Sequence, residues 1–335
     1  MFQENVALSV YSSYKIGGRA KYFYEACGLH DLLLAVKLAK EKSLAVFIFG
    51  GGTNLLIDED GFDGLVLKPN IKFIHASHPE VANGDRRISV GAGVLVADLL
   101  NFCVDHSLSG LEWAGGLPGT VGGAIRGNAG AFGGEIKDII AEVSSLKFKG
   151  FKTPEIIKRN KDECRFGYRN SIFKTEIATS SPFGENQKGW TRNDDVGEII
   201  ISATLNLKRG NQEEIKKAIQ EKIDWRKNKH PMEHPNIGSI FKNIDWAIVP
   251  VVHQESFKEK IKKDPFLVLP TAVVIDRCGL KGVSYGGAMI SPKHPNFIVN
   301  TLGATASDVK NLIQLIKDSV RQKYDIELEE EVQCL

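Results

Sequence analysis

Residues 114–135 read AGGLPGTVGGAIRGNAGAFGGE and carry nine glycines with little charge. Few structural turns need glycine at such density, and apolar residues such as Val121 and Phe132 are unusual in a flexible linker, which is the alternative interpretation. The density favours close approach of the backbone to an extended ligand. Phosphates on such a ligand would be bound by backbone amides and by the side chains of Thr120 or Asn128.

A second glycine run, Gly50–Asn54 (GGGTN), directly follows the apolar segment 44–49 (LAVFIF), which we predict to be a buried strand. A chain without side-chain bulk after a strand can turn its backbone N–H groups toward a pyrophosphate. The run alone is a weak signal, because it matches neither the GxGxxG fingerprint nor a phosphate-binding loop that ends in GK[ST].

The charge balance excludes some classes of function. The chain of 335 residues has 43 Lys and Arg against 41 Asp and Glu, so no global field marks a nucleic-acid or membrane-surface protein. Its five cysteines lack CxxC spacing, which argues against a zinc site or a disulfide framework. No signal-peptide pattern is present, and no apolar run approaches the roughly 20 residues that span a bilayer. We therefore expect a cytoplasmic protein without a metal site.

Hydrophobic periodicity predicts a mixed α+β protein without internal repeats. Helical spacing occurs at residues 31–42, 94–106, 212–227 and 307–323, and strand-like segments at 44–49, 88–93, within 139–207 and at 326–335. Ser307 is the predicted amino-terminal cap of the last helix. A domain boundary is expected near Gly210, because a new helical pattern begins directly after it.

Three segments resemble the flavin-binding motifs of the UDP-N-acetylenolpyruvoylglucosamine reductase family: 16–20 (IGGRA), 49–67 (FGGGTNLLIDEDGFDGLVL) and 114–135. The resemblance follows the order of the family's motifs from Tyr14 to Val332, so it is far more specific than any one motif. It implies FAD and NADPH as cofactors. It also implies the FAD-binding fold of the vanillyl-alcohol oxidase and p-cresol methylhydroxylase type, with two α+β subdomains, plus an α+β substrate-binding domain.

The same resemblance implies a domain layout and a set of flavin contacts. A first FAD-binding subdomain would comprise residues 1–75 completed by 326–335, a second residues 76–210, and the substrate-binding domain residues 211–325. The residues expected to contact FAD are Gly50, Gly51, Gly52, Thr53, Asn54, Gly115, Gly116, Pro118, Gly119, Thr120, Gly122, Gly123, Ala124, Asn128, Gly130, Ala131 and Ile201.

Three short polar motifs resemble the segments that supply the family's catalytic residues: YRNS contains Arg169, GSIFKN contains Ser239 and ELEEEV contains Glu331. Arg169 suits a carboxylate or enolate, which a guanidinium holds through two parallel hydrogen bonds; a surface ion pair is its ordinary alternative. Ser239 would be the proton donor, although without the resemblance Gly238 and Ser239 indicate a turn. Glu331 would polarise the substrate carboxyl together with Arg169 or share a proton.

Six residues are expected to bind the substrate by the same resemblance: Tyr168, Lys229, Lys242, Asn243, His294 and Asn296. Lys229 at a helix end and His294 between two prolines could equally be solvated side chains. The segments GGA and HPNFIVN match the family type without a tyrosine lid loop, so no lid tyrosine is expected. The chain departs from the family pattern at Arg126, Ile244 and Glu330. The polar stretch 175–193 is longer than the pattern, and its function is not predicted.

The family's activity is the NADPH-dependent reduction of UDP-N-acetylglucosamine enolpyruvate to UDP-N-acetylmuramate, in the peptidoglycan synthesis that serves cell shape and cell division. One alternative is an FAD-dependent alcohol or phenol oxidase of the same fold, which would not need Ser239. Another is a UDP-sugar or flavin-binding module without catalysis, against which the presence of Arg169, Ser239 and Glu331 argues. We expect a monomer that takes a small-molecule substrate and binds neither nucleic acid nor membranes.

Overall fold

The computed structural model describes residues 2–77, 85–148, 154–175, 197–263 and 266–335, so almost all of the polar stretch 175–193 lies outside the described residues. The chain forms two compact units. The first comprises Met1–Val6, Ala20–Gly51 and Phe62–Asp224, and the second Ala7–Arg19, Gly52–Gly61 and Trp225–Leu335. The change of unit near residue 224 falls inside helix α5 (Gln212–Lys229), later than the boundary expected near Gly210. The predicted functional layout of three domains stays a prediction.

The first sheet of the first unit has the strand order β1-β2-β5-β3. Its strands are β1 (Gln3–Ala7), β2 (Arg19–Ala26), β5 (Phe62–Pro69) and β3 (Val46–Ile48). Both β2 and β3 pair with β5 in parallel, and parallel strands need crossover connections, one of which contains α1 (Leu29–Glu41). The buried face of α1 joins the apolar side chains of this sheet in one cluster. The structure confirms the predicted helix and the strand after it.

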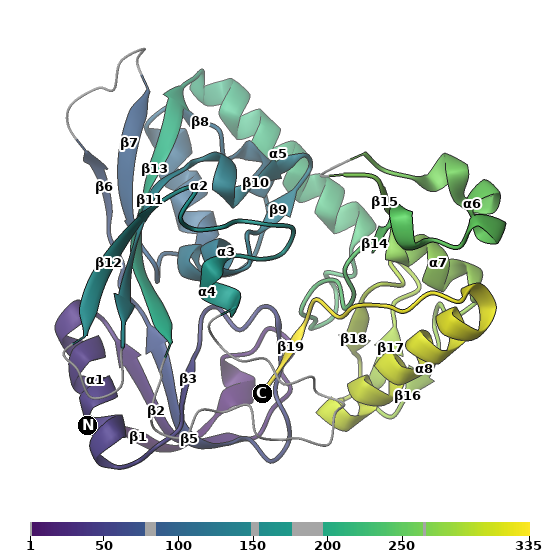
Figure 1. Ribbon diagram of the computed structural model, residues 1–335, viewed down its shortest axis with the longest axis horizontal. Coiled ribbons are helices and arrows are strands. Elements are labelled where there is room, and N and C mark those ends of the chain that lie inside the picture. The colour runs from purple at the N-terminus through teal and green to yellow at the C-terminus, as the bar shows by residue number, and fades with distance from the viewer. Residues whose placement is uncertain (1, 78–84, 149–153, 176–196, 264–265) are drawn as a thin grey trace. The chain divides into compact units, whose positions relative to one another are not determined.

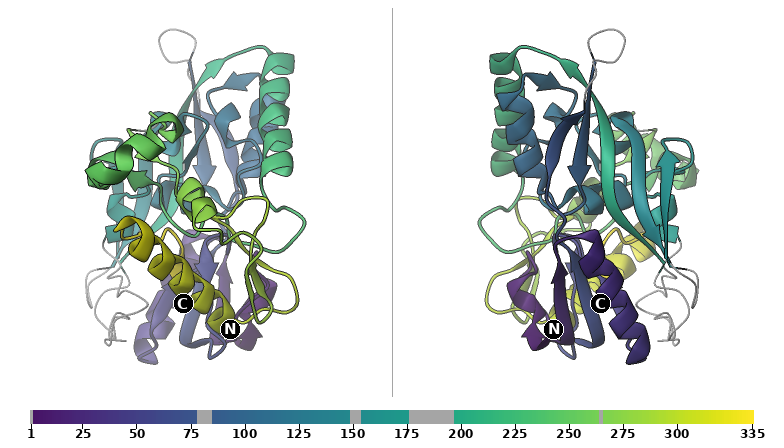
Figure 2. Two further views of the ribbon diagram at one scale, coloured as in Figure 1. Left: turned by 90° about the vertical axis from the view of Figure 1, so that its right-hand side faces the viewer. Right: turned by 90° about the vertical axis from the view of Figure 1, so that its left-hand side faces the viewer.

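The second sheet of this unit is antiparallel, with the order β12-β11-β13-β7-β6 and with β8 also paired to β13. Its strands are β6 (Ile74–Ser77), β7 (Arg86–Gly91), β8 (Leu108–Ser109), β11 (Ile140–Lys147), β12 (Glu155–Asn160) and β13 (Glu198–Arg209). The long strands lie side by side in the right-hand view of Figure 2. Helices α2 (Val96–Asp105) and α3 (Val121–Arg126) pack against strands of this sheet (Figure 1).

The glycine-rich segment 114–135 is not an irregular loop throughout. It follows a 3₁₀ turn (Glu112–Ala114), contains α3 and ends in a hairpin of β9 (Gly130–Ala131) and β10 (Gly134–Glu135). A further 3₁₀ turn (Ile136–Asp138) leads into β11. The glycines therefore allow close packing of short elements as well as exposed backbone.

In its described residues, the second unit is built from short strands and three α-helices that lie wholly within it. The strands are β4 (Leu55–Leu56), β14 (Ile244–Asp245), β15 (Val268–Leu269), β16 (Ser284–Tyr285), β17 (Ala288–Ile290), β18 (Ile298–Asn300) and β19 (Gln333–Cys334). Strands β16, β17 and β18 form an antiparallel sheet, β14 pairs with β15, and β19 pairs in parallel with β4. The helices are α6 (Val251–Phe257), α7 (Thr271–Arg277) and α8 (Ala306–Tyr324).

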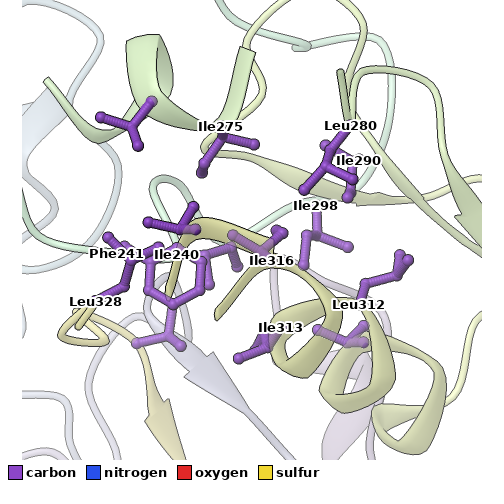
Figure 3. Close-up of a cluster of buried hydrophobic side chains, with 14 of the residues drawn as sticks. Ile240, Phe241, Ile275, Leu280, Ile290, Ile298, Leu312, Ile313, Ile316 and Leu328 are labelled. Atoms are coloured by element: carbon purple, nitrogen blue, oxygen red, sulfur yellow. The ribbon is translucent and has the colours of Figure 1, made fainter. Parts of the chain in front are cut away.

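One hydrophobic cluster holds the second unit together. Helix α8 buries a stripe at helical spacing that includes Leu312, Ile313 and Ile316. These side chains lie in the same cluster as Ile240 and Phe241, which come from the predicted GSIFKN motif (Figure 3). The residues next to Ser239 are therefore fixed in a core, and burial of large apolar side chains stabilises their position.

Two predictions for the carboxy-terminal region were wrong. Thr305, not Ser307, caps α8: its hydroxyl accepts a 3.0 Å hydrogen bond from the N–H of Asp308, whose carboxylate in turn accepts from the N–H of Thr305. This reciprocal pairing is a capping box, and it moves the helix start ahead of Ser307. The expected strand 326–335 is reduced to β19, because residues before it pair only in an isolated bridge at Glu330.

Candidate active site

The first unit brings the two glycine loops together. A Cβ built on Gly51 would lie 2.8 Å from the Cα of Gly119, and one on Gly50 would lie 3.4 Å from the Thr120 hydroxyl oxygen. Gly119 has a φ of 106°, which side-chain-bearing residues rarely adopt. Two loops that are far apart in the sequence thus meet backbone to backbone, as a cradle for an extended ligand requires.

The Thr120 side chain is partly committed within the protein. Its hydroxyl oxygen caps α3 by accepting a 3.3 Å hydrogen bond from the N–H of Gly123. The hydroxyl hydrogen can still be donated to a ligand, since a threonine hydroxyl both donates and accepts. The structure therefore gives the residue a capping role, and its predicted role as a phosphate ligand stays a prediction.

Asn128 connects the glycine-rich segment to the segment that carries Arg169. Its side chain is fully buried, its amide nitrogen donates a 2.9 Å hydrogen bond to the carbonyl of Gly167, and its amide oxygen accepts from the N–H of Lys137 at 3.2 Å. Ser171 adds a second link by donating to the carbonyl of Arg126 at 2.7 Å. Because the side chain of Asn128 is engaged by backbone groups, a flavin contact at this position would come from its backbone.

Several other residues of the predicted flavin set have packing contacts. A Cβ on Gly115 would lie 2.6 Å from the carbonyl oxygen of Ile219 in α5, and one on Gly122 would lie 3.0 Å from the Cβ of Ala92. The carbonyl of Ile201 accepts a 3.0 Å hydrogen bond from the N–H of Ala92. Ala124 is 7% exposed and belongs to the core. Gly116, Pro118 and Gly123 are exposed, and Gly123 lies in α3.

Arg169 lies over the β9–β10 hairpin. One guanidinium nitrogen, Nη2, donates a 3.1 Å hydrogen bond to the carbonyl of Gly130, and a Cβ on Gly130 would come within 3.5 Å of Nη1. The guanidinium carbon lies 5.3 Å from the centre of the Tyr168 ring. The backbone of Arg169 has a φ of 53°, an uncommon conformation for a residue with a side chain. A Cβ at position 130 would instead lie only 2.9 Å from the carbonyl oxygen of Gly134, so glycine preserves the hairpin whose Gly130 carbonyl orients Arg169.

The second unit brings the segments of Ser239 and Glu331 together. The N–H of Glu331 donates a 2.8 Å hydrogen bond to the carbonyl of Ile240, the residue after Ser239. Phe241 and Glu330 form an antiparallel bridge. Ser239 follows Gly238, whose φ is 85°, and its side chain is half-buried. The sequence could not show this pairing, because the two motifs lie about ninety residues apart.

Asn54, predicted to contact FAD, is also hydrogen-bonded to the backbone of Glu331, the predicted catalytic glutamate. Its amide nitrogen donates a 3.0 Å hydrogen bond to the carbonyl of Glu331, and its own carbonyl accepts from the N–H of Gln333 at 3.1 Å. The neighbouring carbonyl of Gly52 accepts from the N–H of Ser13 at 3.0 Å. The end of the first glycine loop thus fixes the backbone on which Glu331 is carried. Thr53, in the same loop, is half-buried.

The predicted substrate residues of the second unit differ in whether their side chains already bond to other groups of the protein. Lys229 is exposed at the end of α5, while Lys242 forms an ion pair with Glu329 and its side chain is 17% exposed. The amide oxygen of Asn243 accepts a 3.4 Å hydrogen bond from the N–H of Thr271. Asn296 is 3% exposed and its amide bonds only to backbone groups of Phe241, so the structure gives no sign of its predicted contact with substrate.

His294 stands in a group of rings that the sequence reasoning did not assemble. Its ring centre lies 5.3 Å from that of His230 and 4.8 Å from that of Phe297. Burial lowers the pKa of His294 to about 4, and burial together with the neighbouring His294 and cations lowers the pKa of His230 to about 3. Both rings are therefore neutral near pH 7, and a neutral imidazole can donate or accept one hydrogen bond at each nitrogen.

A pocket in the first unit was also missed by sequence reasoning. It has a volume of about 520 Å³ and lies beside the β9–β10 hairpin, with Trp113, Phe132 and Lys222 among its lining residues. The ammonium group of Lys222 lies 5.4 Å from the centre of the Phe132 ring. Phe132 comes from the glycine-rich segment 114–135, whereas Trp113 comes from the 3₁₀ turn before it and Lys222 from α5.

Comparisons with known proteins decide the family. The model of the UDP-N-acetylenolpyruvoylglucosamine reductase carboxy-terminal domain matches residues 230–335, and that of an FAD-binding domain matches residues 24–150. Among curated relatives, the UDP-N-acetylenolpyruvoylglucosamine reductase of Caldanaerobacter subterraneus is 33% identical over 99% of this chain and 92% of its own length. The chain belongs to the UDP-N-acetylenolpyruvoylglucosamine reductase family.

Further matches agree with this membership. The reductase of Lactobacillus helveticus is 34% identical over 99% of this chain and 94% of its own length. The crystal structure of the reductase from Thermus caldophilus matches with a TM-score of 0.70 and 27% identity, covering 100% of this chain and 99% of that one. These matches confirm the predicted resemblance and the α+β FAD-binding fold, and they identify the chain as an oxidoreductase of this reductase family.

Membership also assigns the cofactors, FAD and NADPH. The observed meeting of the two glycine loops fits FAD, because a Cβ at Gly51 would close the space between the loops. In the part of the chain that is described, no group of three or more His, Cys, Asp or Glu side chains is arranged to hold a metal ion. Within the same residues, no helix combines the length and apolarity needed to cross a bilayer.

Proposed function

We propose that this reductase uses FAD and NADPH to convert UDP-N-acetylglucosamine enolpyruvate into UDP-N-acetylmuramate. The observation that carries the proposal is the full-length match to reductases of that name, 33% identical over 331 residues. It is supported by the pairing of the Ser239 and Glu331 segments within one unit. FAD, when bound, would accept a hydride from NADPH and transfer it to the methylene carbon of the enolpyruvyl group.

Arg169 would stabilise the negative charge that the substrate gains. Addition of a hydride to the methylene carbon leaves charge on the neighbouring carbon and its carboxylate. A guanidinium is always charged and can hold a carboxylate through two parallel hydrogen bonds. The 3.1 Å hydrogen bond to the carbonyl of Gly130 uses one donor of Nη2 and orients the planar group without exhausting its five donors.

Ser239 would donate the proton that completes the reduction. A serine hydroxyl is a weak acid, so it can act only on a strongly basic carbon and only when already aimed at it. The hydroxyl makes no hydrogen bond among the described residues, is half-buried, and follows a glycine in a left-handed conformation. These features support a hydroxyl that is available to a substrate and held by a well-fixed backbone.

Glu331 would polarise the substrate carboxyl together with Arg169, or share the proton with it. Its backbone is fixed on two sides, by the Ile240 carbonyl and by the side chain of Asn54. Electrostatic groups that are fixed before reaction cost no reorganisation during it. We assign Glu331, rather than its neighbour Glu330, because Glu330 forms an ion pair with Lys317 on α8.

Substrate binding is proposed for Tyr168, Lys229, Lys242, Asn243 and His294. Exposed Lys229 offers a point charge for a phosphate. Lys242 would have to exchange its ion pair with the exposed carboxylate of Glu329 for one with a substrate phosphate, so its charge would keep a partner of opposite sign. We further propose that the enzyme is a cytoplasmic monomer acting in peptidoglycan precursor synthesis, with two FAD subdomains (1–75 with 326–335, and 76–210) and a substrate domain (211–325).

The test is anaerobic stopped-flow absorbance near 450 nm on the purified protein, first with NADPH and then with UDP-N-acetylglucosamine enolpyruvate. Bleaching by NADPH followed by recovery on addition of the substrate would support the proposal. Bleaching with recovery only on admission of oxygen would contradict it and favour the oxidase alternative. A protein with neither flavin absorbance nor turnover would favour the binding module.

A further inference from the structure

We propose that Asn296 is a positioning residue for Ser239 and does not bind the substrate. The inference rests on the proposed function, in which the Ser239 hydroxyl is the proton donor. Asn296 is 3% exposed, and both polar atoms of its amide side chain are bonded to the backbone of Phe241. Its contacts lie on the segment that follows Ser239.

The contacts of Asn296 form a complete clamp on that segment. Its amide oxygen accepts a 3.0 Å hydrogen bond from the N–H of Phe241, and its amide nitrogen donates a 2.8 Å hydrogen bond to the carbonyl of the same residue. Its backbone carbonyl also accepts from the N–H of Ile240 at 2.8 Å. A side-chain amide offers the donor and acceptor pair of a peptide group, so it replaces a strand partner here.

The opposite edge of the same segment is occupied by the chain that carries Glu331. The carbonyl of Ile240 accepts from the N–H of Glu331 at 2.8 Å, and the N–H of Lys242 donates to the carbonyl of Glu329 at 2.9 Å. Ile240 and Phe241 thus have every backbone donor and acceptor paired, on one side by Asn296 and on the other by residues 329–331. The clamp fixes Ser239 and Glu331 in one arrangement.

The segment before Ser239 is fixed by a second amide. The side chain of Asn236 accepts from the N–H of Gly238 at 3.1 Å and donates to the carbonyls of Pro231 and His234 at 3.2 and 2.9 Å. Ser239 itself forms no hydrogen bond with the described residues, so its hydroxyl direction depends on these flanking contacts. A weak acid needs such aim, and misplacement by about 1 Å can cost about 100-fold in rate.

The diagnostic change is Asn296→Asp, which keeps the size and the acceptor but removes the donor to the Phe241 carbonyl. At pH 8 we expect recovery of flavin absorbance with the enolpyruvyl substrate to slow by about 10- to 100-fold. Bleaching by NADPH should stay within about twofold, because that half-reaction needs no proton from Ser239. Lowering the pH should restore the rate, since a protonated carboxyl can donate again and burial favours the neutral form.

Asn300 provides the matched control. It is a buried asparagine of the same unit, 8% exposed, whose amide binds backbone groups of Tyr14 and Ala304 rather than the Ser239 segment. Asn300→Asp should lower the melting temperature but leave the ratio of the two half-reaction rates unchanged. If Asn296→Asp purifies without flavin, the uncharged variant Asn296→Ala is measured in its place. We again expect slower recovery with the substrate and nearly unchanged bleaching by NADPH.

The outcomes separate this inference from the proposed function. Selective slowing of the second half-reaction in the Asn296 variant, absent from Asn300→Asp, supports the positioning role. A raised substrate KM with an unchanged rate at saturation would overturn it, because that pattern belongs to a binding residue. Equal slowing of both half-reactions would overturn it as well. A wild-type enzyme that the enolpyruvyl substrate does not reoxidise would instead overturn the proposed function, and the inference with it.

Discussion

The backbone N–H of Glu331 donates a 2.8 Å hydrogen bond to the carbonyl of Ile240, and this contact helps to join the segments that carry the proposed acid and the proposed glutamate. The backbone of Glu331 and that of Ile240, the residue after Ser239, are both paired by hydrogen bonds. Preorganised groups of this kind act without reorganisation during the reaction. Because this contact is made by backbone groups, we expect substitutions of the Ser239 or Glu331 side chain to change the reaction rate more than the stability of the fold.

Replacement of Ser239 by alanine tests the proton donor. Ser239→Ala should leave flavin bleaching by NADPH within about twofold and slow recovery by the enolpyruvyl substrate by about 100-fold or more, because a general acid contributes on that order. Stopped-flow absorbance resolves the two steps. Ser319→Ala is the control, since the hydroxyl of this half-buried serine on α8 donates a local hydrogen bond to the carbonyl of Leu315. If Ser239→Ala slowed both steps equally, Ser239 would not be the proton donor.

Replacement of Arg169 by lysine tests the guanidinium. A lysine keeps the charge but loses the fork that binds a carboxylate through two hydrogen bonds. We expect Arg169→Lys to lower kcat/KM for the enolpyruvyl substrate by about 10- to 100-fold, equivalent to about 1.4 to 2.7 kcal/mol. Arg165→Lys is the control, because Arg165 is exposed and has a similar φ of 47°. Activity of Arg169→Lys equal to that of the control would contradict the assignment.

A change in the glycine cradle tests the flavin site. Gly51→Ala places a Cβ 2.8 Å from the Cα of Gly119, so one backbone loop must shift. We expect a weaker affinity for FAD by about tenfold or more, since a shift of this size disturbs several amide contacts together. The dissociation constant is measured by flavin fluorescence on addition of FAD to apoprotein. Gly28→Ala is the control, because a Cβ there has no heavy atom within 4 Å. Equal affinities would place FAD elsewhere.

Much of the fold and of the site could be predicted because the signals are local or belong to ordered motifs. The buried stripe of α8 follows from helical spacing, and the glycine segments follow from composition. The roles of Asn128 and Asn296 could not be predicted, because their amides bind backbone groups far along the chain, at Gly167 and Phe241. An asparagine in a motif looks the same whether it binds a ligand or a carbonyl, and only burial distinguishes the two.

The start of α8 is a case in which the sequence predicted the wrong cap, Ser307, although another hydroxyl residue, Thr305, lies two positions earlier. The capping box of Thr305 with Asp308 decides between them. We expect Thr305→Ala to lower the free energy of unfolding by about 1 kcal/mol, the ordinary value of an amino-terminal cap. Ser307→Ala should change it by less than about 0.5 kcal/mol, because the contacts of Ser307, with the side chains of Glu59 and Asn311, are made by its backbone N–H and carbonyl. Urea unfolding of both variants measures the difference, and the reverse order would contradict the assigned cap.

The histidine pair predicts how stability depends on pH. His230 and His294 have pKa values lowered to about 3 and about 4, mainly by burial, whereas an unfolded histidine titrates near about 6.5. The unfolded chain therefore binds more protons between these values. The contribution of the two neutral rings to the free energy of unfolding is fully present above about pH 6.5 and is lost as the pH falls through 6 and 5. For each ring, the free energy of unfolding falls by up to about 1.4 kcal/mol per pH unit.

Urea unfolding between pH 5 and 6.5, where few carboxylates titrate, checks this expectation. His230→Gln should remove one ring's share of the slope, because glutamine takes up no proton in this range. His30→Gln should leave the slope unchanged, since the side chain of His30 is 88% exposed. Identical slopes for the wild type and His230→Gln would mean that His230 takes up its proton in the folded protein as readily as in the unfolded chain. In that case the ring group of His230, His294 and Phe297 would carry a charge near pH 6 and attract anionic ligands, contrary to the neutral pair described above.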